Sequence, residues 1–446
     1  MILIKNARYL IKSADKVLEN VDLLIDGNRI AKIGYDLSGL CHSKAIDATG
    51  KIVCPGFVNM HTHLYQNMLK GVREDLLLKP WCEEVTFPFS GVIRKYAHES
   101  KNFDLAYYYG MLGAIEQIHC GITTFVDMDI IYDALFDSWR DLGVRAVGAI
   151  QAVNRWVPKA LMVDDEVRKR DIQKTIDRWH DNGILKVAIA PSTPFACTPE
   201  FLNWLKDLSV ERGLNLFSHV SENLWEVEQS RRDCGMTPLE YLESIGFLSV
   251  PMCAVHGVHF TPAEIELAKR RGVSVCYNPK SNSKLASGIA PIVEYLQNGI
   301  PVVLATDGAA SNDLLDMFED MRTGLMLQKL KYMDPACMGA REIFRMATQS
   351  GAELLGLDAG VLEEGKLADI ILLDTEKAHF GPVHDVIQNL VYCGKENDVV
   401  ASIINGRIVM EDGVIVSVDE KTAVANATEL ACLRCREAYE KLSAEF

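Results

Sequence analysis

The sequence lacks the features that mark membrane proteins and nucleic-acid-binding proteins. None of its apolar runs approaches about 18 residues, and charged side chains interrupt the opening segment where a signal peptide would be apolar. Its 46 Lys and Arg residues are outnumbered by 61 Asp and Glu residues, so the net charge is −15, which argues against a phosphate-binding surface. We therefore expect a cytoplasmic protein with a small-molecule ligand, no nucleic-acid or membrane partner, and a homo-oligomer as one option.

Paired cysteines are also scarce. The 12 cysteines stand singly except for Cys432 and Cys435, which lie in a helical pattern with no second pair nearby. Disulfide frameworks are typical of short secreted chains, so reduced and mostly buried thiols are the better interpretation. The charged run over residues 163–171 is likewise interpreted as a solvated helix face without a site.

Both ends of the chain have the pattern of β-hairpins. An Asp-Gly turn separates two apolar stretches near the start, and Asn-Gly and Asp-Gly turns separate similar stretches near the end. Neither segment is long enough to bury a core alone, so we expect one small β domain made from both. The expected boundaries are 1–55 together with 366–420 for this domain, 56–365 for a catalytic domain and 421–446 for a C-terminal helix.

Between these ends, eight short runs rich in β-branched residues alternate with helical patterns. Such alternation indicates repeated βα units around a parallel sheet. Eight units predict an α/β fold of the closed (β/α)8, TIM-like barrel type, and an open doubly wound sheet is the alternative. The eight runs span residues 52–61, 121–128, 143–150, 185–192, 213–220, 251–258, 272–279 and 301–308.

Residues able to bind a metal end several of these runs, where the active site of a barrel lies. His61 and His63 are two positions apart on one strand, so both side chains point to the same face. His219 ends the fifth run and Asp307 the eighth. Three imidazoles and a carboxylate suit one divalent metal, Zn²⁺ in preference to Fe²⁺. Taken singly, such a histidine is more often structural and such an aspartate a helix cap.

Two further residues near these ends are candidates for catalysis. Glu222 follows His219 by three positions, close enough to carry protons between a metal-activated water and a leaving group. Its alternative role is that of a carboxylate at the start of a helix. His256 ends the sixth run and can hydrogen-bond the water or the oxyanion, and the residues leave open whether it also binds the metal.

Motifs along essentially the whole chain resemble those of the amidohydrolase superfamily, in its deaminase and chlorohydrolase branch. In chain order they are PGFVNMHTH, GITTFVDM, HVSE, AVHGVH, NPKSNSKLASGIAP, ATDGAASND and GVLEEGKLADIILLD. The resemblance implies a distorted barrel with a small β-sandwich domain built from both termini. The metal ligands that it implies are His61, His63, His219 and Asp307.

The reaction implied by this resemblance is hydrolytic deamination by an activated water. Asp307 accepts the proton of the attacking water. Glu222 protonates a ring nitrogen and helps to expel ammonia, while His256 orients or stabilises the developing oxygen.

Strings such as SNSKLASG and TDGAASN resemble the sub-family that deaminates S-adenosylhomocysteine and methylthioadenosine, yet three nucleoside-binding positions differ. Ser90 stands where that sub-family has a ribose-binding glutamate, and Ser192 stands where it has a substrate-contacting histidine. Ile150 replaces an arginine for the homocysteine carboxylate, and Arg155 is the nearest substitute. These departures argue against a nucleoside substrate.

Gln66, five residues after the first ligand, resembles the base-reading carboxamide of guanine, 8-oxoguanine and some triazine members of the superfamily. We therefore expect a free N-heterocycle as substrate: a purine base of the guanine or 8-oxoguanine type, a pterin or an s-triazine. The alternatives are an adenosine-type deaminase, a triazine chlorohydrolase and an inactive scaffold, the last disfavoured by the complete ligand set. The expected substrate-binding residues are Gln66, Trp81, Ser192, Arg155 and Asn282, of which Gln66, Trp81 and Asn282 also have plain structural roles as alternatives.

Overall fold

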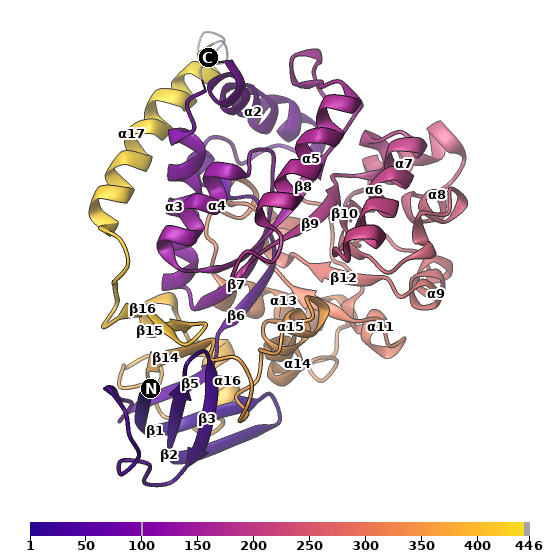
Figure 1. Cartoon of the computed structure of the whole chain (residues 1–446). Coiled ribbons are helices and arrows are strands. Elements are labelled where there is room, and N and C mark those ends of the chain that lie inside the picture. The colour runs from indigo at the N-terminus through magenta and orange to yellow at the C-terminus, as the bar shows by residue number, and fades with distance from the viewer. Residues whose placement is uncertain (100, 441–446) are drawn as a thin grey trace.

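The computed structural model describes residues 1–99 and 101–440 and has a mixed α/β fold (Figure 1). One large mixed sheet and two smaller parallel sheets form its β structure, which confirms the predicted α/β class. No helix in the described part of the chain is both long and apolar enough to cross a membrane. The 12 cysteines are free thiols, and all except Cys41 and Cys432 are at least partly buried.

Strands from both ends of the chain share a nine-stranded sheet. Its order is β17-β16-β15-β14-β5-β1-β2-β3, with β4 paired to β1. The Asn405-Gly406 loop between β15 and β16 has φ angles of 51° and 73°, and two successive positive φ angles are what a tight type I′ hairpin requires. The strands are β1 (Ile2–Ser13), β2 (Lys16–Asp26), β3 (Arg29–Gly34), β4 (Lys44–Asp47), β5 (Lys51–Pro55), β14 (Ile370–Asp374), β15 (Val399–Ile404), β16 (Arg407–Glu411) and β17 (Val414–Ile415).

Eight further strands form two four-stranded parallel sheets, ordered β6-β7-β8-β9 and β10-β11-β12-β13. Backbone hydrogen bonds join these sheets at both seams. Between β9 and β10, the N–H of His219 donates to the carbonyl of Ser192 (2.9 Å) and that of Ile189 to the carbonyl of Asn215 (2.9 Å). Between β13 and β6, the N–H of Asp307 donates to the carbonyl of His61 (3.0 Å). The strands are β6 (Phe57–Thr62), β7 (Ile122–Asp129), β8 (Arg145–Ala152), β9 (Leu185–Pro191), β10 (Phe217–Val220), β11 (Cys253–His256), β12 (Ser274–Tyr277) and β13 (Val302–Leu304).

The first predicted run is divided at Gly56 between two sheets. Its first half is β5 of the large sheet, and its second half is β6 of a parallel sheet. A Cβ on Gly56 would lie only 2.1 Å from Oγ1 of Thr123, so the chain passes too close to β7 for any side chain here. The other seven runs each contain one parallel strand.

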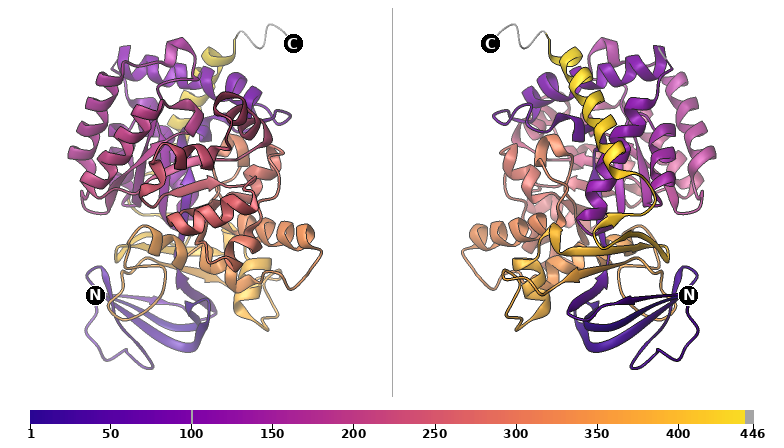
Figure 2. Two further views of the ribbon diagram at one scale, coloured as in Figure 1. Left: turned by 90° about the vertical axis from the view of Figure 1, so that its right-hand side faces the viewer. Right: turned by 90° about the vertical axis from the view of Figure 1, so that its left-hand side faces the viewer.

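Helices follow the parallel strands and surround them (Figures 1 and 2). Three of them begin at a Thr-Pro pair, in which the hydroxyl of Thr198, Thr237 or Thr261 accepts a backbone N–H of the first turn. The helices are α1 (Leu78–Trp81), α2 (Phe87–Arg94), α3 (Asp104–His119), α4 (Asp133–Leu142), α5 (Asp165–Trp179), α6 (Pro199–Arg212), α7 (Leu224–Cys234), α8 (Pro238–Ser244), α9 (Pro262–Arg271), α10 (Pro279–Lys284), α11 (Ile292–Gln297), α12 (Ala309–Asn312), α13 (Met317–Tyr332), α14 (Ala340–Met346), α15 (Gln349–Leu354), α16 (Val386–Cys393) and α17 (Glu420–Tyr439).

The C-terminal helix α17 packs against α3 and α2 (Figures 1 and 2). The Tyr439 hydroxyl donates to the carbonyl of Val85 (2.7 Å), and the Cys435 thiol donates to the carbonyl of Met68 (3.1 Å). Residues 441–446 of the expected C-terminal helix lie outside the described residues. The last helix therefore fixes the segment between β6 and α3, which forms one wall of the site.

Candidate active site

The four metal-binding residues expected at three strand ends lie close together. Nε2 of His61 is 3.2 Å from Nε2 of His219 and 3.3 Å from Oδ1 of Asp307. Nε2 of His63 is 3.6 Å from the same carboxylate oxygen. The ligand atoms of His61, His63 and His219 lie within 4.8 Å of one another, as do those of His61, His256 and Asp307.

Backbone carbonyls hold two of these imidazoles in place. Nδ1 of His63 lies 2.6 Å from the carbonyl oxygen of Met128, and Nδ1 of His219 lies 2.5 Å from that of Ser192. A ring that donates from Nδ1 has its lone pair on Nε2, so both Nε2 atoms face the shared space as acceptors. Backbone atoms of neighbouring strands thus set the orientation of the ligands.

The electrostatics of this cluster fit one divalent cation. Burial lowers the pKa of His61 to about 4, and burial also lowers the pKa of His63 and His219. The three rings are therefore neutral near pH 7 and offer lone pairs that would repel one another across an empty centre. Imidazole nitrogens and one carboxylate are ligands that suit zinc, so the donor set fits that ion.

Asp307 is held as a carboxylate at the centre of the site. Its Oδ2 accepts hydrogen bonds from the hydroxyls of Ser281 (2.5 Å) and Ser311 (3.0 Å). Burial alone would raise its pKa, but the hydrogen bond with His61 and the nearby imidazoles outweigh burial and keep that pKa well below the ordinary value. Its φ of +63° is rare for a residue with a side chain, which is typical of strain at functional positions.

Glu222 and His256 lie side by side next to the metal-binding cluster. Nε2 of His256 is 3.6 Å from Oε2 of Glu222, and both side chains are buried. Burial, followed by repulsion from Asp307, raises the pKa of Glu222 to about 8. Oδ1 of Asn282 lies 2.8 Å from Nδ1 of His256, which fixes the ring so that Nε2 faces Glu222.

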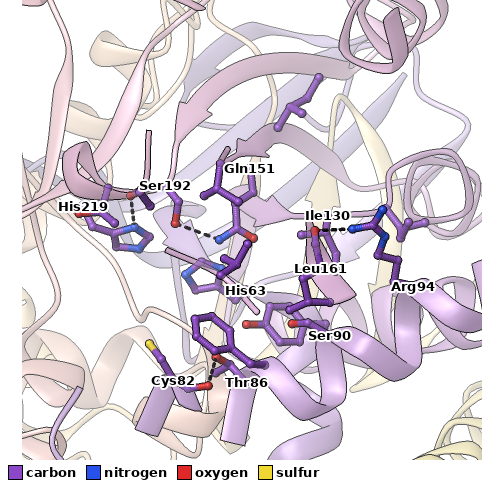
Figure 3. A pocket seen from close by; sticks show the side chains of 18 of the residues that line it. His63, Cys82, Thr86, Ser90, Arg94, Ile130, Gln151, Leu161, Ser192 and His219 are labelled. Atoms are coloured by element: carbon purple, nitrogen blue, oxygen red, sulfur yellow. Dashed lines mark hydrogen bonds between the residues drawn. The ribbon is translucent and has the colours of Figure 1, made fainter. Parts of the chain in front are cut away.

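A cavity of about 810 Å³ opens over the cluster, and His63, His219, Glu222, His256 and Asp307 are part of its wall. Figure 3 shows His63, His219 and Ser192 on one side of this cavity and Arg94, Leu161 and Ile130 on the other. Other lining residues are Gln66, Trp81, Cys82, Thr86, Phe87, Ser90, Ile150, Gln151, Trp156, Phe195 and Glu226.

Two of the expected substrate-binding residues are not in the cavity wall. Arg155 is exposed, and its Nε donates instead to the carbonyl of Phe195 (2.8 Å). Asn282 lies behind His256 and contacts that ring. The remaining three, Gln66, Trp81 and Ser192, do line the cavity.

The charged run over residues 163–171 lines the cavity, so its interpretation as a purely solvated face was wrong. Val163, Val167, Arg168 and Asp171 from this segment are part of the wall. Val163 precedes α5, whereas Val167 and Asp171 are four positions apart within it, a spacing that places both on one helix face. Glu226 was also missed, although it lies only four positions after Glu222.

Comparisons with known proteins agree with this geometry. The amidohydrolase family matches residues 52–409. A 5-methylthioadenosine/S-adenosylhomocysteine deaminase of Thermococcus sibiricus is 35% identical over 92% of this chain and 94% of its own length. A 5′-deoxyadenosine deaminase of Methanosphaera stadtmanae is 37% identical over 96% of this chain and 97% of its own.

Solved structures are similar over nearly the whole chain. An adenosine deaminase from Xanthomonas campestris with bound zinc superposes with a TM-score of 0.90 at 26% identity, covering 97% of this chain and 98% of that one. A mutant atrazine chlorohydrolase from Arthrobacter aurescens, complexed with zinc and atraton, has a TM-score of 0.90 at 28% identity, with coverages of 97% and 100%.

Proposed function

The chain belongs to the amidohydrolase family and is a metal-dependent hydrolytic deaminase, and we propose that its substrate is an adenosine-type nucleoside that loses its amino group as ammonia. The names of the relatives that match it over more than nine-tenths of both chains carry this proposal. They favour the alternative of an adenosine-type deaminase over the expectation of a free purine base or a pterin.

The size of the cavity supports a nucleoside. Small-molecule sites have volumes of about 300–1,000 Å³. At about 810 Å³, this cavity is in the upper part of that range and has room for a sugar and a 5′ substituent beside the base. Ser90 and Ser192 would offer hydroxyls to the sugar, and the hydroxyl of Ser192 already accepts a hydrogen bond from Nε2 of Gln151 (3.0 Å).

The residues that would hold the zinc ion are His61, His63, His219 and Asp307. When bound, such an ion polarises water and makes it nucleophilic near neutral pH. The carboxylate of Asp307 would accept a proton from that water, and it is available as an acceptor because the hydrogen bond with His61 and the nearby imidazoles keep its pKa low and the group ionised. Ser281 and Ser311 hold the carboxylate in position for this transfer.

Glu222 would supply the proton that the purine ring needs. Its pKa of about 8 keeps the carboxyl mostly protonated at pH 7, so it can donate to a ring nitrogen. Protonation of that nitrogen makes the adjacent amino-bearing carbon more electrophilic. The adjacent His256, fixed by Asn282, would then orient the oxygen that develops on this carbon.

Gln66 would contact the edge of the base. Its Oε1 accepts the backbone N–H of Ala310 (3.2 Å), which turns the carboxamide toward the loop after β13. A Cβ on Gly308 would lie 2.2 Å from the same oxygen, so glycine is needed for this approach. Trp81 would form part of the apolar wall.

We further infer that strands β6 to β13 form one closed, distorted barrel over residues 56–365. Backbone hydrogen bonds between the parallel sheets, at Ser192–His219 on one side and at His61–Asp307 on the other, support closure at both seams. The nine-stranded sheet would then be the separate β domain of residues 1–55 and 366–420, with α17 as the C-terminal addition.

An ammonia-release assay on the purified protein tests the function. The nucleosides to be tested are adenosine, 5′-deoxyadenosine, methylthioadenosine and S-adenosylhomocysteine. Their kcat/KM values should be at least about 100-fold higher than those of guanine, 8-oxoguanine and a pterin, which is a difference of about 3 kcal/mol in activation free energy. Faster turnover of any free base would overturn the proposal. Chloride release from atrazine tests the second candidate, a triazine chlorohydrolase, which the similarity to the Arthrobacter enzyme supports.

A further inference from the structure

The loop between α10 and α11, residues 285–291, contacts the side chain of Glu222. The hydroxyl of Ser287 in this loop donates to Oε1 of Glu222 over 3.4 Å, and both side chains are buried. Among residues 1–99 and 101–440, Ser287 is the only residue whose side chain forms a hydrogen bond with this carboxyl group. The loop after α10 therefore determines how the carboxyl group is turned.

The two oxygens of this carboxyl group have different surroundings. Oε1 accepts the hydrogen bond from Ser287, whereas Oε2 lies 3.6 Å from Nε2 of His256. In a protonated carboxyl group the carbonyl oxygen is the better acceptor, so the bond from Ser287 favours the acid proton on Oε2. The hydroxyl of Ser287 thus directs the acidic oxygen of Glu222 toward His256 and the cavity.

His259 contacts both partners of this hydrogen bond. Its backbone N–H donates to the carbonyl of Ser221, the residue before Glu222, over 3.1 Å. Its ring Nε2 lies 2.7 Å from the carbonyl oxygen of Ser287. A carbonyl oxygen only accepts hydrogen bonds, so Nε2 is the protonated nitrogen of the ring. One residue thereby joins the loop that carries Ser287 to the turn that carries Glu222.

The start of the loop is tied to the residue that holds His256. The backbone N–H of Ser287 donates to the carbonyl of Asn282 (2.8 Å). The side chain of Asn282 is the group that fixes the ring of His256, with its Oδ1 at 2.8 Å from Nδ1. The end of α10 and the residues after it therefore orient both His256 and Glu222.

Helix α13 holds the other end of the loop. Nε2 of the buried Gln328 donates to the carbonyl of Ala290 (3.0 Å). Nζ of Lys331 donates to the carbonyl of Ile289 (2.9 Å). Ser287 thus lies between two anchored ends, and its hydroxyl has a defined place relative to Glu222.

We propose that Ser287 and His259 are positioning residues for the proton donor: His259 holds the loop and the turn together, and Ser287 orients the carboxyl group of Glu222. The inference rests on the proposed function, because it takes Glu222 as the group that protonates the purine ring. Within the described part of the chain, neither residue belongs to the cavity wall or to the metal-binding cluster, so each acts through Glu222.

Steady-state kinetics of Ser287→Ala in the zinc-loaded, full-length protein give the first test, with whichever of the four nucleosides the wild type deaminates fastest. The variant should lower kcat by about 10-fold, because a misdirected acid transfers its proton less efficiently. KM and zinc content should change less than threefold. The matched control on α10 is Ser283→Ala, whose exposed hydroxyl donates to the carbonyl of Pro279 (2.7 Å), and it should leave kcat unchanged.

A double-mutant cycle separates positioning of the acid from a general structural role. Glu222→Gln has no acid proton to direct, so adding Ser287→Ala to it should lower the residual kcat by less than about twofold. The cycle is measured at high enzyme concentration, since the residual rate is small. A loss of about 10-fold in both backgrounds would mean that Ser287 acts independently of Glu222, and it would overturn the proposal.

Two substitutions of His259 test the link between the loop and the turn. His259→Gln retains a side-chain N–H that can reach the carbonyl of Ser287, and His259→Leu does not. His259→Leu should lower kcat by about 10-fold and His259→Gln by less than about threefold, with KM nearly constant in both. His180→Leu is the control, because this half-buried ring also bonds to the backbone, accepting the N–H of Val187 (3.3 Å), but lies outside the cavity wall.

The outcomes distinguish this inference from the proposed function. Thermal unfolding shows whether each variant is folded, and the Ser287 cycle decides the proposal if His259→Leu is not. Deamination by the wild type with a kcat that Ser287→Ala does not lower would overturn the positioning roles and leave the proposed function standing. Failure of the wild type to release ammonia from any of the four nucleosides would overturn the proposed function, and the inference with it.

Discussion

Glu226 accepts the backbone N–H of Glu222 over 2.7 Å with one carboxylate oxygen, and that of Ser221 over 3.0 Å with the other. Ser221 has a φ of +53°, a left-handed conformation that is rare outside glycine. The carboxyl group of Glu226, whose pKa burial raises to about 8, therefore stabilises the strained turn that carries Glu222 into the cavity. Glu226 is a positioning residue for the proton donor.

Replacing Glu226 should slow the chemical step, because the turn that positions Glu222 would lose the hydrogen bonds that stabilise it. A glutamine retains one acceptor oxygen, so Glu226→Gln should lower kcat by about 10-fold, and Glu226→Ala, which retains none, by about 100-fold. KM and zinc content should change less than threefold, since neither variant touches the metal-binding cluster. A KM effect as large as the kcat effect, measured by steady-state kinetics, would contradict a positioning role.

The pH profile of the reaction should report the protonation of Glu222. Because the acid form donates the proton and the pKa is about 8, kcat/KM should be retained below that pH and fall as the pH rises through it. Glu222→Gln cannot donate a proton, and it should lower kcat by about 10²- to 10⁴-fold while zinc content stays normal. An alkaline limb that persists unchanged in the residual activity of this variant would assign the titration to another group.

Removal of the metal should abolish activity and lower thermal stability. A chelator should eliminate ammonia release, and added zinc should restore it. The apoprotein should have a lower Tm, because neutral imidazoles crowded around Asp307 are stabilised by a cation bound only in the folded state. His61→Ala should bind less than about a tenth of the zinc of the wild type by elemental analysis. Full activity in a zinc-free sample would contradict the proposed metal site.

Loss of the hydrogen bond between Tyr439 and Val85 should affect substrate binding at the cavity wall more than the free energy of unfolding. Tyr439→Phe removes a single hydrogen bond, which is worth about 1 kcal/mol in the free energy of unfolding. Since Val85 lies just before Thr86, Phe87 and Ser90 in the wall, KM should rise about two- to fivefold. Thermal unfolding and steady-state kinetics of the variant, with Tyr108→Phe on α3 as a matched tyrosine control, measure both effects.

Much of the candidate active site could be predicted from the sequence, because its residues lie at or near strand ends. An apolar β-branched run predicts where a strand stops, and His61, His63, His219 and His256 lie at or next to such ends. Asp307 was found in the same way, although it lies three residues beyond β13. The sequence could not reveal that Ser192 and Met128 orient two of the imidazoles, since those contacts use backbone carbonyls.

The substrate side of the cavity was less predictable, because helices and loops build it. A charged helix such as α5 can present Arg168 to solvent or to a cavity, and charge patterning alone does not distinguish these faces. Likewise, the differences at Ser90, Ile150 and Ser192 were interpreted one position at a time as evidence against a nucleoside. The structure places other polar groups, Gln151 and Arg94 among them, in the wall of the same cavity.

The pairing of β14 with β5 in the nine-stranded sheet has a consequence for synthesis of the chain. β14 lies between β5 and β15, and Ile370 is opposite Pro55 in the antiparallel ladder. Until residue 374 has left the ribosome, the edge of β5 that pairs with β14 stays free. β6, which carries His61, comes directly after β5 in the chain. An unpaired strand edge is a template for aggregation, so the nascent chain needs protection at β5 through most of translation.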